Sequence, residues 1–280
     1  MKVKLSTILL YLVAAVLMVM IVVPILLLFG LAFSQSPVTI QGFTLDNFKF
    51  LTSGVLFQEN PIYSKLYPNV YAVTINTMLL ALGNMVLVVL ISSMAAYVIS
   101  RYSFRGRSAL LGTFLIIHGV PASVLLIALY FMLRQLNLLN TMLGVILVRM
   151  SVDLPLGVWV LKGFYDSVPW DIEIASLVDG TSRLGAFYKV MLPLVKPGIF
   201  AVALFSFLSG WGEYIFVYTF IQSQVNWTLS LLIRSLVGEM GGINLSLIAA
   251  LSVFYLLPVL ALYIVGEKYL VRVTIGGVKG

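Results

Sequence analysis

The sequence predicts an all-α integral membrane protein with six transmembrane helices and a helical hairpin on the cytoplasmic side. Hydrophobic residues make up 61% of the 280 residues and charged residues only 10%, and the mean hydropathy is +1.09. Soluble domains carry about 25% charged residues. The chain has too little polar surface to cover itself in water, so we expect the lipid bilayer to be its solvent.

Six apolar runs have the length of about 20 residues that a helix needs to cross a bilayer. The first run exceeds the ~7–15-residue core of a secretory signal, so we interpret it as an uncleaved helix. Pro24 and Pro258 bend the first and last runs, and Pro121 interrupts the third. The predicted spans, within a single domain over 1–280, are residues 8–31, 70–99, 110–133, 142–162, 198–221 and 246–268.

The basic residues predict the orientation. With both termini inside, 12 of the 17 Lys and Arg residues fall on inside segments, and Arg149 lies within a span. Only Lys49, Lys65, Arg134 and Arg234 lie outside. Cytoplasmic loops carry the excess of Lys and Arg, so we expect cytoplasmic termini and a cytoplasmic loop at residues 166–197. Because these basic residues follow topology and form no cluster, we expect no nucleic-acid partner.

The loop at 166–197 reads as two amphipathic helices joined by a turn. The pair Asp179-Gly180 is typical of a turn, and Thr181 or Ser182 can cap the second helix. Pro193 and Pro197 are expected to end that helix. The apolar residues at helical spacing are Ile174, Leu177 and Val178, then Leu184, Phe187, Tyr188 and Met191. Such a hairpin suits a membrane surface or a partner's groove.

This stretch resembles the EAA loop of ABC importer permeases, the segment that inserts into a cleft on the ATP-hydrolysing subunit. The matching residues are Ala175, Asp179, Gly180, Phe187, Pro193 and Pro197. The family usually has Glu before an Ala pair, where this chain has Ile174 and, for the second Ala, Ser176; Glu173 lies one residue earlier. The resemblance implies contacts with the ATPase by Glu173, Ala175, Ser176, Asp179, Gly180, Phe187 and Pro193.

Other stretches extend the resemblance from Asn76 to the C-terminus. The segment from Ala95 to Arg107 is similar to the exit of the family's second helix, and the final Gly-Gly-Val-Lys-Gly is similar to the tail of maltose-type sugar permeases. For those subunits the tail reaches between the two ATPases, which implies such a place for Gly277 and Lys279. The alternative for this tail is a frayed terminus.

The chain offers no catalytic constellation. It contains one histidine, His118, and no cysteine, which excludes a His/Cys metal site and a Cys–His dyad. No Gly-Lys-Ser/Thr occurs, so there is no P-loop for ATP. We therefore expect a chain that is not an enzyme and binds no cofactor, with ATP and Mg²⁺ held by separate ATPase subunits. We interpret His118 as a partner of backbone groups freed by Pro121, with a role in lining the path as the alternative.

Two polar groups inside spans are candidates for a substrate path. Arg149 and Asp153 are four residues apart and share a helix face; they either neutralise each other, or Asp153 hydrogen-bonds a passing hydroxylated solute. Residues Trp211, Glu213 and Tyr214 follow one another closely in the fifth span and either line the cavity or pack and anchor the helix.

Together these features predict one permease subunit of a prokaryotic ATP-driven importer, in the cell membrane, for a sugar or oligosaccharide. By resemblance its partners are a second related permease, two ATP-binding subunits and an extracytoplasmic solute-binding protein. The alternatives are a secondary transporter driven by an ion gradient, for which matched repeats with broken helices are expected, and an intramembrane enzyme.

Overall fold

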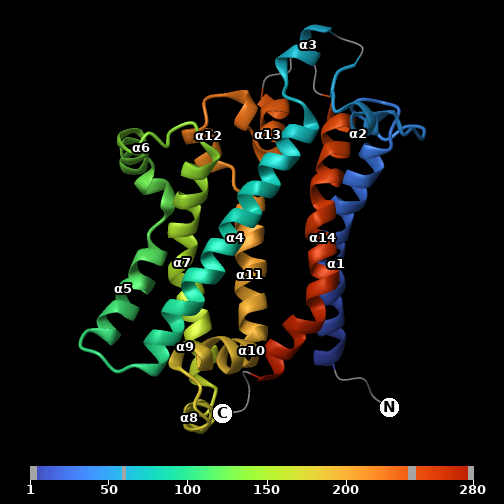
Figure 1. Ribbon diagram of the computed structural model, residues 1–280. Helices are drawn as coiled ribbons and strands as arrows, with labels where there is room; N and C mark the ends of the chain where they lie inside the picture. The colour runs from blue at the N-terminus through green and yellow to red at the C-terminus, as the bar shows by residue number, and fades with distance from the viewer. Residues whose placement is uncertain (1–4, 59–60, 239–243, 277–280) are drawn as a thin grey trace. The chain divides into compact units, whose positions relative to one another are not determined.

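Helices make up most of the computed structural model, which describes residues 5–58, 61–238 and 244–276 (Figure 1). The described residues contain no strand. By its internal contacts the chain divides into two compact units, Met1–Val70 with Leu232–Pro258, and Tyr71–Leu231 with Val259–Gly280. The expected all-helical membrane fold is confirmed, whereas the single domain over 1–280 stays a prediction.

The first unit begins with α1, Leu5–Ala32. None of the most apolar stretch of this helix is buried. An irregular segment follows, with the short helices η1, Asp46–Phe48, α2, Phe50–Ser53, and α3, Pro61–Leu66. The first part of α14, Leu245–Gly276, joins this unit. There the Ser246 hydroxyl donates to the Ser36 carbonyl at 2.5 Å, and Phe254 meets Phe50 edge to face.

The second unit is a helical bundle around α7, Met142–Asp166, which packs against α5, Arg107–Gly119, and α11, Lys196–Trp211. The Thr141 side chain caps α7 by accepting from the Gly144 N–H at 3.1 Å. Besides the helices of residues 170–194 and the end of α14, this unit contains α4, Val70–Arg101, η2, Ala122–Leu125, α6, Leu126–Gln135, α12, Ile215–Phe220, η4, Gln224–Asn226, and the start of α13, Leu229–Gly238.

Among the described residues, four helices are long and apolar enough to cross a membrane, namely Leu9–Ala32, Ser64–Arg101, Met142–Asp166 and Leu245–Gly266. Two bent pairs raise the number to six if each is one span. Arg107–Gly119 and Ala122–Gln135 meet at 88°, with Pro121 at the break. Arg183–Leu194 and Lys196–Trp211 meet at 77°.

Two boundaries differ from the sequence-based expectation. The predicted fifth span over 198–221 is interrupted, because α11 ends at Trp211 and α12 begins at Ile215. Pro193 and Pro197 were expected to end the second helix of the hairpin, but each lies in the first turn of a helix, α10, Leu192–Leu194, or α11. A first turn accepts proline because its N–H groups have no partner within the helix.

Candidate functional site

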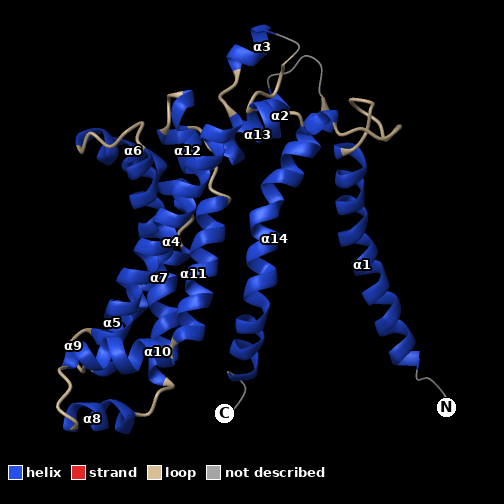
Figure 2. Cartoon of the chain, turned by 45° about the vertical axis from the view of Figure 1, so that its right-hand side comes forward, coloured by secondary structure: helices blue, strands red, loops and turns tan. Residues whose placement is uncertain are grey.

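The predicted hairpin lies where α4 and α7 end (Figure 2). It consists of α8, Trp170–Val178, then α9, Arg183–Ala186, the π-turn η3, Phe187–Met191, and α10. Between α8 and α9, Gly180 adopts φ +85°, and the Thr181 N–H donates to the Ser176 carbonyl at 3.1 Å. Of the two candidate caps, Ser182 caps α9, because its hydroxyl accepts from the Gly185 N–H at 3.1 Å.

A buried ion pair fastens the hairpin to the end of α4. Arg101 Nε lies 3.0 Å from Glu173 Oε2, and both side chains are at most 3% exposed. The Tyr97 hydroxyl donates to the other oxygen of Glu173 at 2.6 Å. Arg101 also donates to the Val168 carbonyl at 2.8 Å and covers the Trp170 ring at 4.8 Å. Glu173 thus holds the first turn of α8 against the end of α4.

An aromatic cluster continues this attachment. Phe187 is 3% exposed and lies 4.9 Å from the Tyr97 ring, which also meets Tyr165 edge to face. Met191 is fully buried in the same cluster. Arg183 donates to the hydroxyl of Tyr102 at 3.1 Å. The hairpin also exposes large apolar side chains, among them Trp170, Ile172, Ile174, Val178, Leu184 and Tyr188.

The residues that the resemblance assigns to ATPase coupling divide into two groups. Glu173, Ser176 and Phe187 are buried, and Glu173 and Phe187 attach the hairpin to this chain's own bundle. Those that are exposed, and therefore open to a partner, are Ala175, Asp179, Gly180 and Pro193. Gly277 and Lys279 of the predicted tail contact lie outside the described residues.

A second polar site lies within the bundle, centred on Arg149 of α7. Its guanidinium binds Asp153 at 2.7 Å, Glu213 at 2.9 Å and the Ser209 hydroxyl at 3.0 Å. Asp153 also accepts from Ser209 and, at 2.8 Å, from the Asn84 amide of α4. Glu213 lies in the break between α11 and α12. The Arg149 network therefore joins four elements.

Glu213 also organises this break. Its Oε1 accepts from the Phe216 N–H at 2.8 Å, which satisfies a donor at the start of α12. Its carbonyl accepts from the Ser230 hydroxyl of α13 at 2.6 Å. The self-neutralising pair suggested by the sequence is therefore incomplete, because one guanidinium faces two carboxylates.

The other proposed path residues lie differently. Trp211 is 2% exposed and stacks on Phe207 with ring centroids 5.7 Å apart, so in this conformation it belongs to the packed interior. Tyr214 is half-buried and stacks on Tyr218 at 5.6 Å. A substrate-path role for these residues and for Asp153 stays a prediction.

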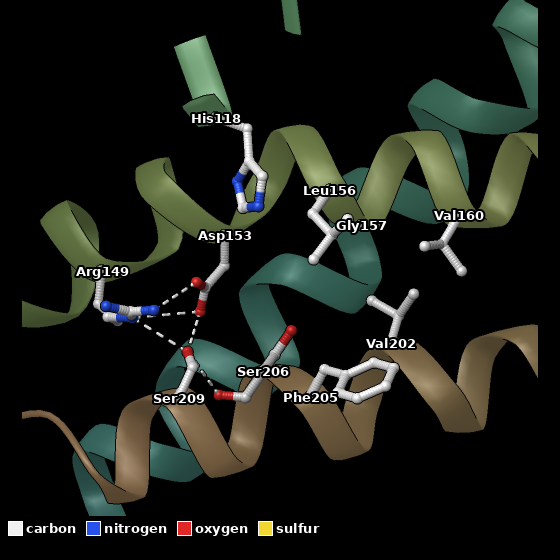
Figure 3. Close-up of a pocket in the computed structure, with 10 residues that line it drawn as sticks. All are labelled: His118, Arg149, Asp153, Leu156, Gly157, Val160, Val202, Phe205, Ser206 and Ser209. Atoms are coloured by element: carbon white, nitrogen blue, oxygen red, sulfur yellow. Dashed lines mark hydrogen bonds and ion pairs between the residues drawn. The ribbon is translucent and has the colours of Figure 1, made fainter. Parts of the chain in front are cut away.

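A pocket of about 250 Å³ borders the Arg149 network (Figure 3). It lies between α5, α7 and α11, and Asp153 and Arg149 form part of its polar end. The residues lining it are His118, Arg149, Asp153, Leu156, Gly157, Val160, Val202, Phe205, Ser206 and Ser209.

Sequence reasoning did not assign a role to Asn84, Ser209 or Arg101. Asn84 is one of two amides in the long apolar helix α4 and lies near its middle, a position that is costly unless the amide has a partner. The cost of burying this amide was the only feature of the sequence that could have pointed to Asn84. The partners of Asn84 and of Arg101 are more than 60 residues away in the chain.

Comparisons with known proteins agree with this architecture. Residues 88–272 match the family of binding-protein-dependent transport system inner membrane components. The chain is 34% identical over 238 residues to the maltodextrin transport system permease protein MdxG of Bacillus subtilis, covering 85% of this chain and 81% of that protein. It is 30% identical over 277 residues to the galactooligosaccharides permease protein GanQ of the same species, covering 96% and 94%.

Among solved structures, one bacterial ABC transporter that imports the acidic polysaccharide alginate has a similar chain, with a TM-score of 0.77. The match covers 96% of this chain and 99% of that one, at 18% identity, and so concerns the fold. The family match spans well over half of the chain and the two permeases cover most of it. The chain therefore belongs to the family of binding-protein-dependent transport system inner membrane components, the multi-pass permease subunits of ABC importers.

Proposed function

We propose that this chain is one of two permease subunits of an importer for neutral oligosaccharides, driven by ATP hydrolysis on separate subunits. Two relatives that match most of its length carry maltodextrin and galactooligosaccharides in their names. The partners would be a second permease, two ATP-binding subunits holding ATP and Mg²⁺, and an extracytoplasmic solute-binding protein. Both termini and the hairpin would face the cytoplasm, in keeping with the distribution of basic residues.

The hairpin α8–α10 is the observation that carries this proposal. One of its faces is locked to the bundle through the buried Arg101–Glu173 pair. The hairpin also presents exposed apolar side chains, such as Val178 at 80% and Leu184 at 63% exposure. Such a rigid, apolar projection fits a groove on a partner. Movement of the partner would then be transmitted to α4 through Arg101.

ATP can drive transport only if the nucleotide-bound partners bind one conformation of the permease better than the other. In that scheme the hairpin acts as a lever and takes no part in the chemistry. The breaks at Pro121 and at residues 212–214 would also suit a secondary transporter. An ion-driven mechanism, however, gives the exposed hairpin no partner, and family membership favours the ATP-driven one.

Purification of the tagged chain from its native membrane tests this proposal. We expect an ATP-binding protein to co-purify with the chain. We also expect the complex, in proteoliposomes with its solute-binding protein, to accumulate maltotriose or galactotriose only when ATP is enclosed. Uptake that proceeds at full rate without nucleotide, or that follows an imposed ion gradient, would refute it.

A further inference from the structure

The pocket beside the Arg149 network has one polar end and apolar walls (Figure 3). Leu156 and Val160 of α7 face Val202 and Phe205 of α11 along these walls. The polar end combines hydrogen-bond donors and acceptors, because it contains a carboxylate, hydroxyls, a guanidinium and the His118 imidazole. This combination suits a ring that has hydroxyl groups at its edge and C–H groups on its faces.

Ser206 supplies an independent sign of a ligand. Its residue is 3% exposed, yet its hydroxyl makes no hydrogen bond to any residue that the structure describes. Figure 3 shows this hydroxyl pointing from α11 into the space toward α7. The backbone there is fixed, since the Ser206 carbonyl accepts from the Asn84 amide at 2.7 Å. Ser206 lines the pocket, so its hydroxyl is available to a molecule there.

The size of the pocket limits what can enter. Sites for drug-sized ligands occupy about 300–1,000 Å³. At about 250 Å³ this pocket is smaller, and it fits a single ring better than a whole oligosaccharide. A chain of sugars would place one unit here and extend along the rest of the path.

The charge of the network limits the ligand further. Arg149 is bound by both Asp153 and Glu213, so these three side chains together carry one excess formal negative charge. In a poorly solvated site this charge repels a carboxylate or a sulfonate. It does not oppose the hydroxyls of a neutral sugar, which can donate to Asp153.

We propose that this pocket is a subsite for one neutral sugar ring, in which Ser206 and Asp153 contact the ring and select it against acidic sugars. The proposal rests on the proposed function, because it assigns part of the solute path to this chain. To that function it adds the location of one subsite, the size of the ring that fits it, and the exclusion of negatively charged ligands. Glu213 acts through Arg149 and is a positioning residue.

The test measures uptake by the complete transporter in proteoliposomes, with labelled maltotriose as the neutral probe and labelled trimannuronate as the acidic probe. Ser206→Ala removes the free hydroxyl and keeps the carbonyl that binds Asn84. We expect it to raise KM for maltotriose about threefold to tenfold, the effect of one lost hydrogen bond, with kcat changed less. Ser151→Ala on α7 is the matched control, because Ser151 does not line the pocket and, among the described residues, its hydroxyl bonds only to the Leu147 carbonyl. The KM of this variant should be that of the wild type.

Asp153→Asn tests the exclusion of negatively charged ligands separately. It removes the excess negative charge, so the ratio of maltotriose to trimannuronate uptake should fall at least fivefold. An unchanged KM in Ser206→Ala would overturn the subsite even if Asp153→Asn fails to fold, and so would a wild type that prefers trimannuronate. A wild type that accumulates neither probe nor galactotriose would overturn the proposed function, and the subsite with it.

Discussion

Arg101 at the end of α4 and Glu173 in the first turn of α8 form an ion pair of 3.0 Å from which water is almost excluded. The pair lies 72 positions apart in the sequence and makes the hairpin and the bundle one mechanical piece. A hairpin that transmits force needs such an attachment. An exposed pair would be worth little, whereas the loss of one buried partner leaves an uncompensated charge.

We predict that Glu173→Ala releases the hairpin. Leaving Arg101 buried and unpaired costs about 3–5 kcal/mol. Because the pair holds α8 in place, this cost favours detachment of the hairpin from the bundle. Limited proteolysis of residues 170–182 should become at least tenfold faster. Arg105→Gln is the control, since Arg105 is exposed and forms no ion pair among the described residues; cleavage of Glu173→Ala at the rate of this control would contradict the prediction.

Ala175→Phe should separate folding from coupling. Ala175 is exposed on α8, so a larger side chain meets nothing within this chain but obstructs a partner's groove. We expect an unchanged thermal midpoint in detergent and at least a tenfold loss of both co-purified ATPase and sugar uptake. Ala109→Phe, an exposed alanine on α5, should affect neither quantity. Normal uptake in Ala175→Phe would remove α8 from the docking surface.

The sequence predicts the helices and the hairpin well, because both depend on local patterns. Apolar runs locate α4, α7 and α14, and the Asp179-Gly180 pair locates the turn that Gly180 makes with φ +85°. The residues of the two sites are harder to predict from the sequence. The i,i+4 spacing reveals Arg149 with Asp153, but nothing local indicates that Glu213 and Asn84 meet them from other helices. Whether Trp211 faces a cavity or the core depends on packing that composition does not encode.

Replacing two glycines by alanine should change the stability of the protein in opposite directions. A Cβ on Gly210 would lie 2.9 Å from the Ala81 Cα, and backbone cannot yield as a flexible side chain can. The resulting separation of α4 from α11 should cost about 1–3 kcal/mol. A Cβ on Gly163 of α7 meets nothing within 4 Å, so Gly163→Ala should stabilise the helix by about 0.5–1 kcal/mol. Thermal unfolding in detergent measures both, and equal effects would disprove the close contact.

The Arg149 network should behave as a unit. Arg149→Met leaves Asp153 and Glu213 facing each other without their cation, and we expect a loss of about 3–5 kcal/mol. Adding Glu213→Gln removes one of the two stranded charges, so the double variant should be more stable than Arg149→Met alone, with a coupling energy of about 0.5–3 kcal/mol.

Lys162→Met provides the matched control on the same helix. Lys162 pairs with Asp166 near the end of α7, where the side chains are 20% and 40% exposed. Solvent screens this pair, so its loss should cost about 0–1 kcal/mol. Thermal and denaturant unfolding of the variants in one detergent give the comparison. If Arg149→Met were no more destabilising than Lys162→Met, or if the effects of Arg149→Met and Glu213→Gln simply added, the network would not hold the four elements together.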